Sequence, residues 1–170
     1  MYHPDKYQPH NEALDRFCTL FNQAAARLGA LISMQPSAIE NFREDGKIVY
    51  TLTGASILYD FEMRDRHYNT CGFPFKDFGQ FERKILKPEI ALSIQCSKDE
   101  TCFCLAWHED FKQVPVKYMG SVTAPGDKEY TGKRFTTAFK ELNYSQMDDF
   151  YLMLLKAFSD DAFNATCFRI

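Results

Sequence analysis

The sequence predicts an α+β fold in which a mostly antiparallel sheet of five or six strands is packed by an N-terminal and a C-terminal helix. Two observations predict it. Apolar residues recur at helical spacing near both ends of the chain. Between these stretches, short segments alternate apolar and polar residues and are separated by turn residues such as Asp45-Gly46 and Lys98-Asp99. A chain of 170 residues with no linker or repeat is expected to form a single domain, residues 1–170.

The N-terminal helix is expected to begin at Asn11, a residue type favoured at the N-cap, and to end near Ser33, ahead of Pro36. Residues 1–10, which hold two prolines, are expected to form an irregular arm. The C-terminal helix is expected to open at Ser145, in the capping-box pattern Ser-x-x-Asp. The buried stripe of the first helix is expected to consist of Leu14, Phe17, Cys18, Phe21, Ala24, Ala25, Leu28, Leu31 and Ile32.

Six short segments have the pattern of strands. They are residues 47–53, 57–64, 78–86, 90–96, 101–108 and 114–121. Gly54-Ala55 is expected to turn the first strand into the second as a hairpin. Pro88 ends the third strand, and the third to fifth strands are expected to form an antiparallel meander. The last strand is expected at an edge of the sheet, because Pro115 lacks a backbone donor.

The composition limits the expected partners. The formal net charge is −3, so no overall basic field attracts nucleic acid or an anionic membrane, although a local basic groove is still allowed. The chain has no apolar run of 18 residues, so no membrane partner is expected. Its first residues lack the pattern of a secretory signal, which makes a cytoplasmic location and six reduced cysteines the expectation.

The second expected strand, Ile57–Arg64, alternates strictly between apolar and polar positions. Its apolar face consists of Ile57, Tyr59, Phe61 and Met63, and its opposite face of Leu58, Asp60, Glu62 and Arg64. The first face suits a core. The second face spaces two acids and a base about 7 Å apart along the strand. This charged face is the first candidate for a site.

The third expected strand adds a second set of charges. It would place Gln80, Glu82 and Lys84 on one face. If the two charged faces meet, the carboxylates of Asp60, Glu62 and Glu82 lie near the lysine. Such carboxylates suit a hard divalent cation, Mg²⁺ or Mn²⁺, and the lysine could position an attacking water or stabilise developing charge.

The order of a helix, a strand, a strand with Asp60 and a strand with Glu82-Arg83-Lys84 resembles the PD-(D/E)XK nuclease superfamily over residues 11–86. The resemblance implies a metal-dependent nuclease that acts on phosphodiesters of nucleic acid. It implies that Asp60 and Glu82 bind the metal and that Lys84 is the catalytic lysine, with Glu40 as a further acid. A second register, Asp60-x-Glu62-x-Arg64, is also open. The alternative for both registers is a set of ordinary cross-strand charge pairs on a wetted sheet face.

Two neighbouring loops suggest partners. The basic and aromatic residues Arg64, Arg66 and His67 could contact phosphates and bases of nucleic acid, or could form a solvated loop. The loop Phe73–Phe78 either packs into the core or offers an apolar patch to a protein partner. The second possibility defines a non-enzymatic protein-binding or inhibitor module. Whether the chain is an enzyme is left open by the sequence.

A possible zinc set consists of Cys96, Cys102, Cys104 and His108. Its spacing argues against zinc, because residues i and i+2 of a strand lie about 7 Å apart and structural zinc sites favour tight Cys-x-x-Cys turns. Packing as small buried residues is the expected alternative for these cysteines.

Overall fold

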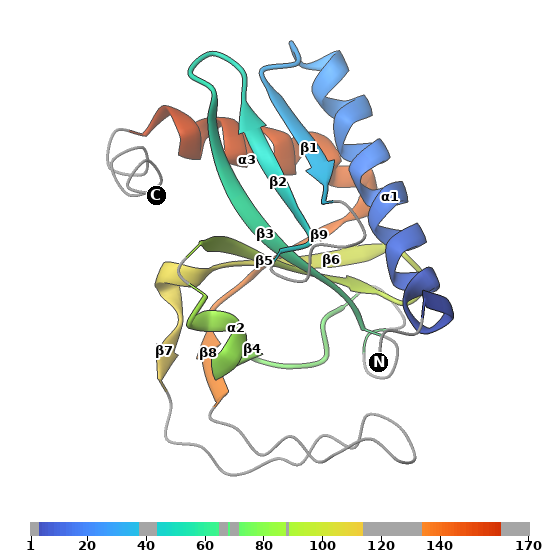
Figure 1. The fold of residues 1–170 in the computed structure, drawn as a ribbon, viewed down its shortest axis with the longest axis vertical. Helices are drawn as coiled ribbons and strands as arrows, with labels where there is room; N and C mark the ends of the chain where they lie inside the picture. Colours follow the sequence, from blue (N-terminus) through green and yellow to red (C-terminus); the bar gives the residue numbers. More distant parts are fainter. Residues whose placement is uncertain are drawn as a thin grey trace.

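The computed structural model describes residues 4–37, 44–64, 68, 72–87, 89–113 and 134–160. A six-stranded sheet runs through its centre, with the strand order β1-β2-β3-β5-β6-β9 (Figure 1). Its strands are β1 (Ile32–Pro36), β2 (Gly46–Tyr50), β3 (Ala55–Arg64), β5 (Ile90–Ser97), β6 (Cys102–Trp107) and β9 (Lys140–Asn143). All neighbouring strands are antiparallel except β3 and β5, which are parallel. The predicted α+β class and mostly antiparallel sheet are confirmed.

Two helices, α1 (Pro4–Arg27) and α3 (Met147–Ser159), cover one face of this sheet (Figure 1). Aromatic rings fill the core between them. The ring of Phe17 lies 5.0 Å from Phe103 of β6 in an edge-to-face arrangement, and Phe21 lies 5.1 Å from Phe150 of α3. The prediction that the terminal helices share a face of the sheet is therefore confirmed. None of the described helices is both long enough and apolar enough to cross a membrane.

The opposite face of the sheet is covered by a small second sheet and a loop. The strands β4 (Phe78–Phe81), β8 (Arg134–Thr137) and β7 (Lys112–Gln113) pair in that order, and a short helix α2 (Glu82–Ile85) follows β4 (Figure 1). The 3₁₀ turns η1 (His108–Asp110) and η2 (Tyr144–Gln146) complete the described elements. A second core lies on this face and contains Tyr68, Phe78, Cys102, Cys104 and Ala106.

The N-terminal helix differs from its predicted limits at both ends. It begins at Pro4 rather than Asn11 and includes Pro9, whose missing N–H removes a backbone bond only near the helix start. It ends at Arg27 rather than near Ser33. The chain then enters the left-handed region at Gly29, with φ of 106°, and the Ala30 N–H bonds to the Ala25 carbonyl, which closes the helix. Of the apolar residues beyond this stop, Leu28 and Leu31 lie in the connection and Ile32 begins β1, although their spacing also fits a helix.

The third predicted strand is only half correct. It ends at Phe81, and Glu82–Ile85 forms the short helix α2. Glu, Arg and Lys are good helix formers, and the alternation of residue types over only four residues fits a helical turn as well as a strand. The predicted meander is wrong for its first strand, because β4 pairs with β8 in the small sheet and β5 lies parallel to β3. Its second pair is confirmed, since β5 and β6 are antiparallel neighbours. The strand predicted at residues 114–121 lies outside the described residues.

Gly46, the first residue of β2, allows three strands to approach closely. It pairs with Pro36 of β1 and with Tyr59 of β3. A Cβ atom at this position would collide with the carbonyl oxygen of Gln35 and with the Tyr59 ring. The Tyr59 hydroxyl also donates a hydrogen bond to that carbonyl at 3.2 Å. The space above Gly46 is therefore filled, and the residue before it, Asp45, is held in place.

We expect Gly46→Ala to lower the free energy of unfolding by about 3 kcal/mol, because a buried ring and a paired carbonyl would both have to move. Chemical denaturation at pH 7 measures the loss. The matched control is Gly54→Ala in the β2–β3 turn, where φ is +73° but a Cβ meets nothing within 4 Å. That change strains only the backbone and costs about 1 kcal/mol. Equal losses for the two variants would contradict the steric account.

Candidate functional site

The charged face of β3 lies on the side of the sheet away from the helices. Tyr59 and Phe61 are buried in the core under α1 and α3. The period of two then turns Asp60 and Glu62 to the opposite face, toward β4 and α2. Asp60 is buried and Glu62 is about one-third exposed, with 31% of its side chain accessible. The strand that buries the core thus carries two carboxylates beneath the second layer.

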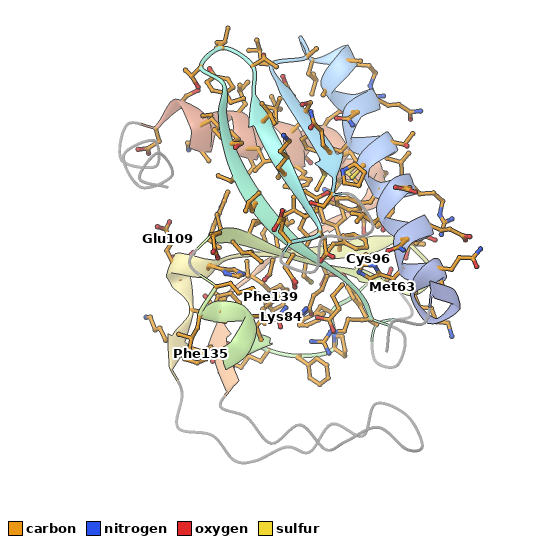
Figure 2. The ribbon with its side chains drawn as sticks, in the orientation of Figure 1. Met63, Lys84, Cys96, Glu109, Phe135 and Phe139 are labelled. Atoms are coloured by element: carbon orange, nitrogen blue, oxygen red, sulfur yellow. The ribbon has the colours of Figure 1, made fainter. Side chains whose placement is uncertain are left out.

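Lys84 reaches these carboxylates from α2. Its Nζ lies 2.7 Å from Oδ2 of Asp60 and 3.6 Å from Oε2 of Glu62. Figure 2 labels Lys84 in the region between the central sheet and α2. The side chain of Asp60 is 9% exposed and that of Lys84 is 16% exposed. The ammonium is therefore withdrawn from solvent and shared between two acids.

Two buried glutamines orient the carboxylates. Gln80 of β4 donates from Nε2 to Oδ2 of Asp60 at 3.4 Å. Gln95 of β5 donates from Nε2 to Oε2 of Glu62 at 3.5 Å and accepts a bond from Nε of Arg64 at 3.1 Å. Arg64 also lies 3.7 Å from Oε1 of Glu62. Each acid on β3 thus has a fixed polar neighbour from another strand.

Asp45 adds a third carboxylate that the sequence analysis interpreted only as part of a turn. Its Oδ2 accepts a 2.7 Å bond from the backbone N–H of Phe61, the residue after Asp60. Its own N–H donates to the Tyr59 carbonyl at 3.1 Å. Burial raises the pKa of Asp45, and the charge of Asp60 raises it further. Asp45 and Asp60 are therefore close enough to repel each other.

His10 of α1 also borders this region and was missed by the sequence analysis. Its Nε2 lies 2.8 Å from the carbonyl oxygen of Phe61, so this nitrogen carries the proton and donates. The bond holds the β3 backbone between Asp60 and Glu62. No sequence motif indicates this role, because it arises only when α1 packs across the strand.

The charges set the protonation of the site. For Lys84, burial acts to lower the pKa, but Glu62 and Asp60 outweigh it and the pKa is raised. For Glu62, burial acts to raise the pKa, but Lys84 and Arg64 outweigh it and the pKa is lowered. At neutral pH, Lys84 is therefore an ammonium ion and Glu62 a carboxylate. The lysine is suited to stabilise negative charge rather than to accept a proton.

The predicted residues divide into two groups. Asp60, Glu62, Arg64 and Lys84 lie together. The side chains of Glu82, Arg66, His67 and Glu40 lie outside what the structure describes. The prediction that Glu82 and Lys84 share a strand face is wrong, because both belong to α2. Lys84 nevertheless meets Asp60, since the helical turn brings it back over β3.

The carboxylates around Lys84 do not form a closed metal cage. The described residues contain no group of three His, Cys, Asp or Glu side chains arranged to hold a metal ion. Mg²⁺ needs fewer protein ligands, because it keeps several waters and commonly uses one or two carboxylates. Asp45 and Asp60 are two carboxylates in this region, and the Lys84 ammonium already lies 2.7 Å from Oδ2 of Asp60.

The cysteines considered for zinc do not converge. Cys96 lies in the core under the helices, whereas Cys102 and Cys104 lie in the second core across the sheet. The β5–β6 register explains this, since Cys96 pairs with Phe103, and Phe103 points away from its two cysteine neighbours. Burial raises the pKa of the Cys96 and Cys104 thiols to about 12. These residues act as buried packing groups.

The Phe73–Phe78 loop is packed at its two ends, whereas residues 74–77 are exposed. Phe78 is fully buried, and the Phe73 ring lies 4.8 Å from Phe139 and 5.2 Å from Tyr68. The Phe73 N–H also donates a 2.6 Å bond to Oε2 of Glu141. Phe75, which is 48% exposed, is the aromatic residue of this loop that faces solvent. Two of the three rings thus serve the second core.

No protein-family model matches this chain, and comparisons with curated proteins and with solved structures found no significant match. What the chain does is therefore inferred from its own side chains.

We expect Lys84→Met to lower the free energy of unfolding by about 3 kcal/mol, because the Asp60 carboxylate would stay buried without its cation. Adding Asp60→Asn to this variant should recover part of the loss. Chemical denaturation of both single variants and the double variant at pH 7 gives the coupling energy. Lys98→Met, at an exposed turn, serves as the control and should change stability by less than about 0.5 kcal/mol. A Lys84→Met loss as small as that of the control would contradict a buried ion pair.

We expect Asp45→Asn to stabilise the protein at pH 7 by about 1 kcal/mol, because the variant removes a buried negative charge that lies near Asp60. The pKa of Asp45 is higher in the folded protein than in the unfolded chain, so its ionised form costs stability. The advantage of the variant should disappear as the pH falls and the native carboxyl becomes protonated.

The matched control for this change is Asp99→Asn. Hydrogen bonds from Ser97 and Thr101 lower the pKa of Asp99, so its charge favours folding and its removal should destabilise. Thermal unfolding of both variants and of the unaltered protein is measured between pH 4 and pH 7, about every half pH unit. At pH 7, Asp45→Asn should be more stable than the unaltered protein and Asp99→Asn less stable. A destabilised Asp45→Asn protein at pH 7 would contradict the electrostatic account.

Proposed function

We propose that this protein is a divalent-metal-dependent nuclease that hydrolyses phosphodiester bonds of nucleic acid. The observation that carries the proposal is the contact of the Lys84 ammonium with two carboxylates, 2.7 Å from Asp60 and 3.6 Å from Glu62. Asp45 stands beside them as a third acid. Three separate segments of the chain supply this cluster, at a cost in stability that a purely structural surface would avoid.

Hydrolysis of a phosphodiester requires charge stabilisation and a positioned water. A divalent ion held by Asp45 and Asp60 would supply Lewis acidity toward the phosphate and lower the pKa of a bound water. Lys84, which stays cationic, would balance the extra negative charge that develops on the phosphate oxygens. Glu62 and Gln95 would keep the lysine aligned. Arg64 would offer a positive group at the more exposed rim of the site, where a phosphate backbone can approach.

The proposal favours the second register, Asp60-x-Glu62-x-Arg64, in which both acids of the motif lie on β3 and Arg64 stands at the lysine position. Lys84 then joins these acids from α2 and not from a third strand of the same sheet. The resemblance to the PD-(D/E)XK superfamily would then hold for the acids on β3 and differ in the origin of the lysine. The alternative, a protein-binding module built on Phe73–Phe78, has weaker support because Phe78 is buried and Phe73 is half-buried against the second core, which leaves Phe75 as the exposed ring.

We expect the purified chain to cleave DNA or RNA in Mg²⁺ or Mn²⁺ but not in EDTA. Single- and double-stranded DNA and RNA would be tested in parallel. Asp60→Asn should reduce the rate by about 100-fold or more, since it removes a charge that organises the site. Glu82→Ala distinguishes the two registers: it should retain most of the activity if Glu62 is the second acid.

The control for this assay is Glu100→Gln, which breaks a two-pronged ion pair with Arg16 at 2.8 Å, between α1 and the β5–β6 turn. It removes a carboxylate of similar chemistry without touching the candidate site and should leave the rate unchanged. Absence of cleavage for every substrate and metal would overturn the proposed function. Cleavage that persists in Asp60→Asn would place the activity elsewhere.

A further inference from the structure

A hollow of about 510 Å³ lies beside the small second sheet. Its walls come from η1, β7 and the end of β8, together with Asp77, the residue before β4. Neither Asp60 nor Lys84 is among the described residues that line it, so it is separate from the site proposed above. Clefts that bind small molecules have volumes of roughly 300–1,000 Å³. The hollow is therefore large enough for an organic ligand.

The hollow carries an excess of negative charge. Asp77, Glu109 and Asp110 contribute three carboxylates, whereas Lys112 contributes one ammonium group, and all four residues are exposed. Figure 2 labels Glu109 at the outer side of the molecule, near β7. No ion pair or side-chain hydrogen bond joins any of the three carboxylates to a described residue. A bound cation would neutralise this excess, whereas an anion would meet three like charges.

Thr137 adds a polar group that lines the hollow although the residue is almost wholly buried. It is the last residue of β8, pairs with Phe78 of β4 and is 9% exposed. Its hydroxyl makes no hydrogen bond to a described residue. The fully enclosed polar atoms of the described chain that have no partner belong to His108 and Tyr144, so the Thr137 hydroxyl is open to the hollow. Polar groups of buried residues are nearly always paired, which indicates a missing partner here.

The arrangement of the acids favours an organic cation over a metal ion. The described residues do not bring three His, Cys, Asp or Glu side chains together where they could hold one metal ion. The carboxylates are instead distributed around a hollow of small-molecule size. A ligand with several ammonium groups can place a separate positive charge beside each carboxylate and donate charge-assisted hydrogen bonds to it. A threonine hydroxyl can accept a further bond from such a group.

We propose that this hollow binds an aliphatic cation in which ammonium groups are separated by methylene chains. Glu109 and Asp110 bind one ammonium group at η1, Asp77 binds a second, and the hydroxyl of Thr137 accepts a hydrogen bond from the ligand. This binding does not depend on the proposed nuclease function. The same chemistry occurs in a free polyamine and in neighbouring lysine side chains of a peptide, and the experiment distinguishes these two sources.

The test uses the full chain, with spermidine and amidated tri-lysine as probes and Mg²⁺ as the comparison. Calorimetric titration at pH 7 is carried out at low ionic strength, because salt screens exposed charges. We expect the double variant Glu109→Gln/Asp110→Asn to bind spermidine about 5-fold more weakly. Thr137→Val keeps the shape of the side chain but lacks the hydroxyl and should also bind about 5-fold more weakly. The control is Glu100→Gln, which removes a carboxylate elsewhere and should leave the affinity unchanged.

A second measurement uses the unaltered protein and so does not depend on how the variants fold. Amide chemical shifts are followed by NMR during titration with spermidine. Changes concentrated at residues 109–112 and 136–138 support the proposal, and changes confined to other residues overturn it.

The outcomes of the titrations decide between a built site and a diffuse attraction. Weaker binding by both the double variant and Thr137→Val supports the proposal. Binding that is unchanged in either of them overturns it, as does binding of Mg²⁺ alone or of no probe. Tighter binding of tri-lysine assigns the cation to a peptide, and tighter binding of spermidine assigns it to a free polyamine. Either result supports the shared chemistry.

Discussion

The buried ion pair between Asp60 and Lys84 joins the second layer of the protein to its central sheet. Removing two charges from water is costly, and their attraction offsets that cost only when further polar groups complete the geometry. Glu62 and Gln80 provide those groups here, at 3.6 Å from the lysine and 3.4 Å from Asp60. α2 can therefore lie over β3 only in an orientation that places Lys84 between the two acids.

The parallel pairing of β3 with β5 arranges the rest of the site. It sets Asp60 beside Ser93 and Glu62 beside Gln95. Each acidic residue of β3 thus has a polar neighbour at its own level on β5. A shift of one residue would bring the apolar side chains of one strand beside the polar ones of the other. The register of β3 and β5 therefore determines which polar groups meet as well as how the two strands pair.

The two faces of the central sheet are covered by different kinds of residues. The face under α1 and α3 is packed with aromatic rings and provides most of the apolar burial. The other face mixes a small apolar core with buried polar groups, including an unpaired histidine nitrogen. A second face that buries paired charges and a histidine nitrogen without a described partner contributes less to stability than an apolar layer would. Such arrangements are typical of functional sites, where stability is given up for chemistry.

The sequence by itself determined the class of fold, the two helical layers and the charged face of β3, because helical stripes and strict alternation are local properties. It also indicated that Asp60, Glu62 and Lys84 belong together, although it placed Lys84 on a strand. Tertiary structure alone decided which strand lies parallel to β3, that Glu82–Ile85 forms a helical turn, and that Asp45 and His108 lie near β3 and β5. All of these features depend on contacts between segments that are far apart in the chain. Packing and strand register select such contacts, and no local sequence pattern encodes them.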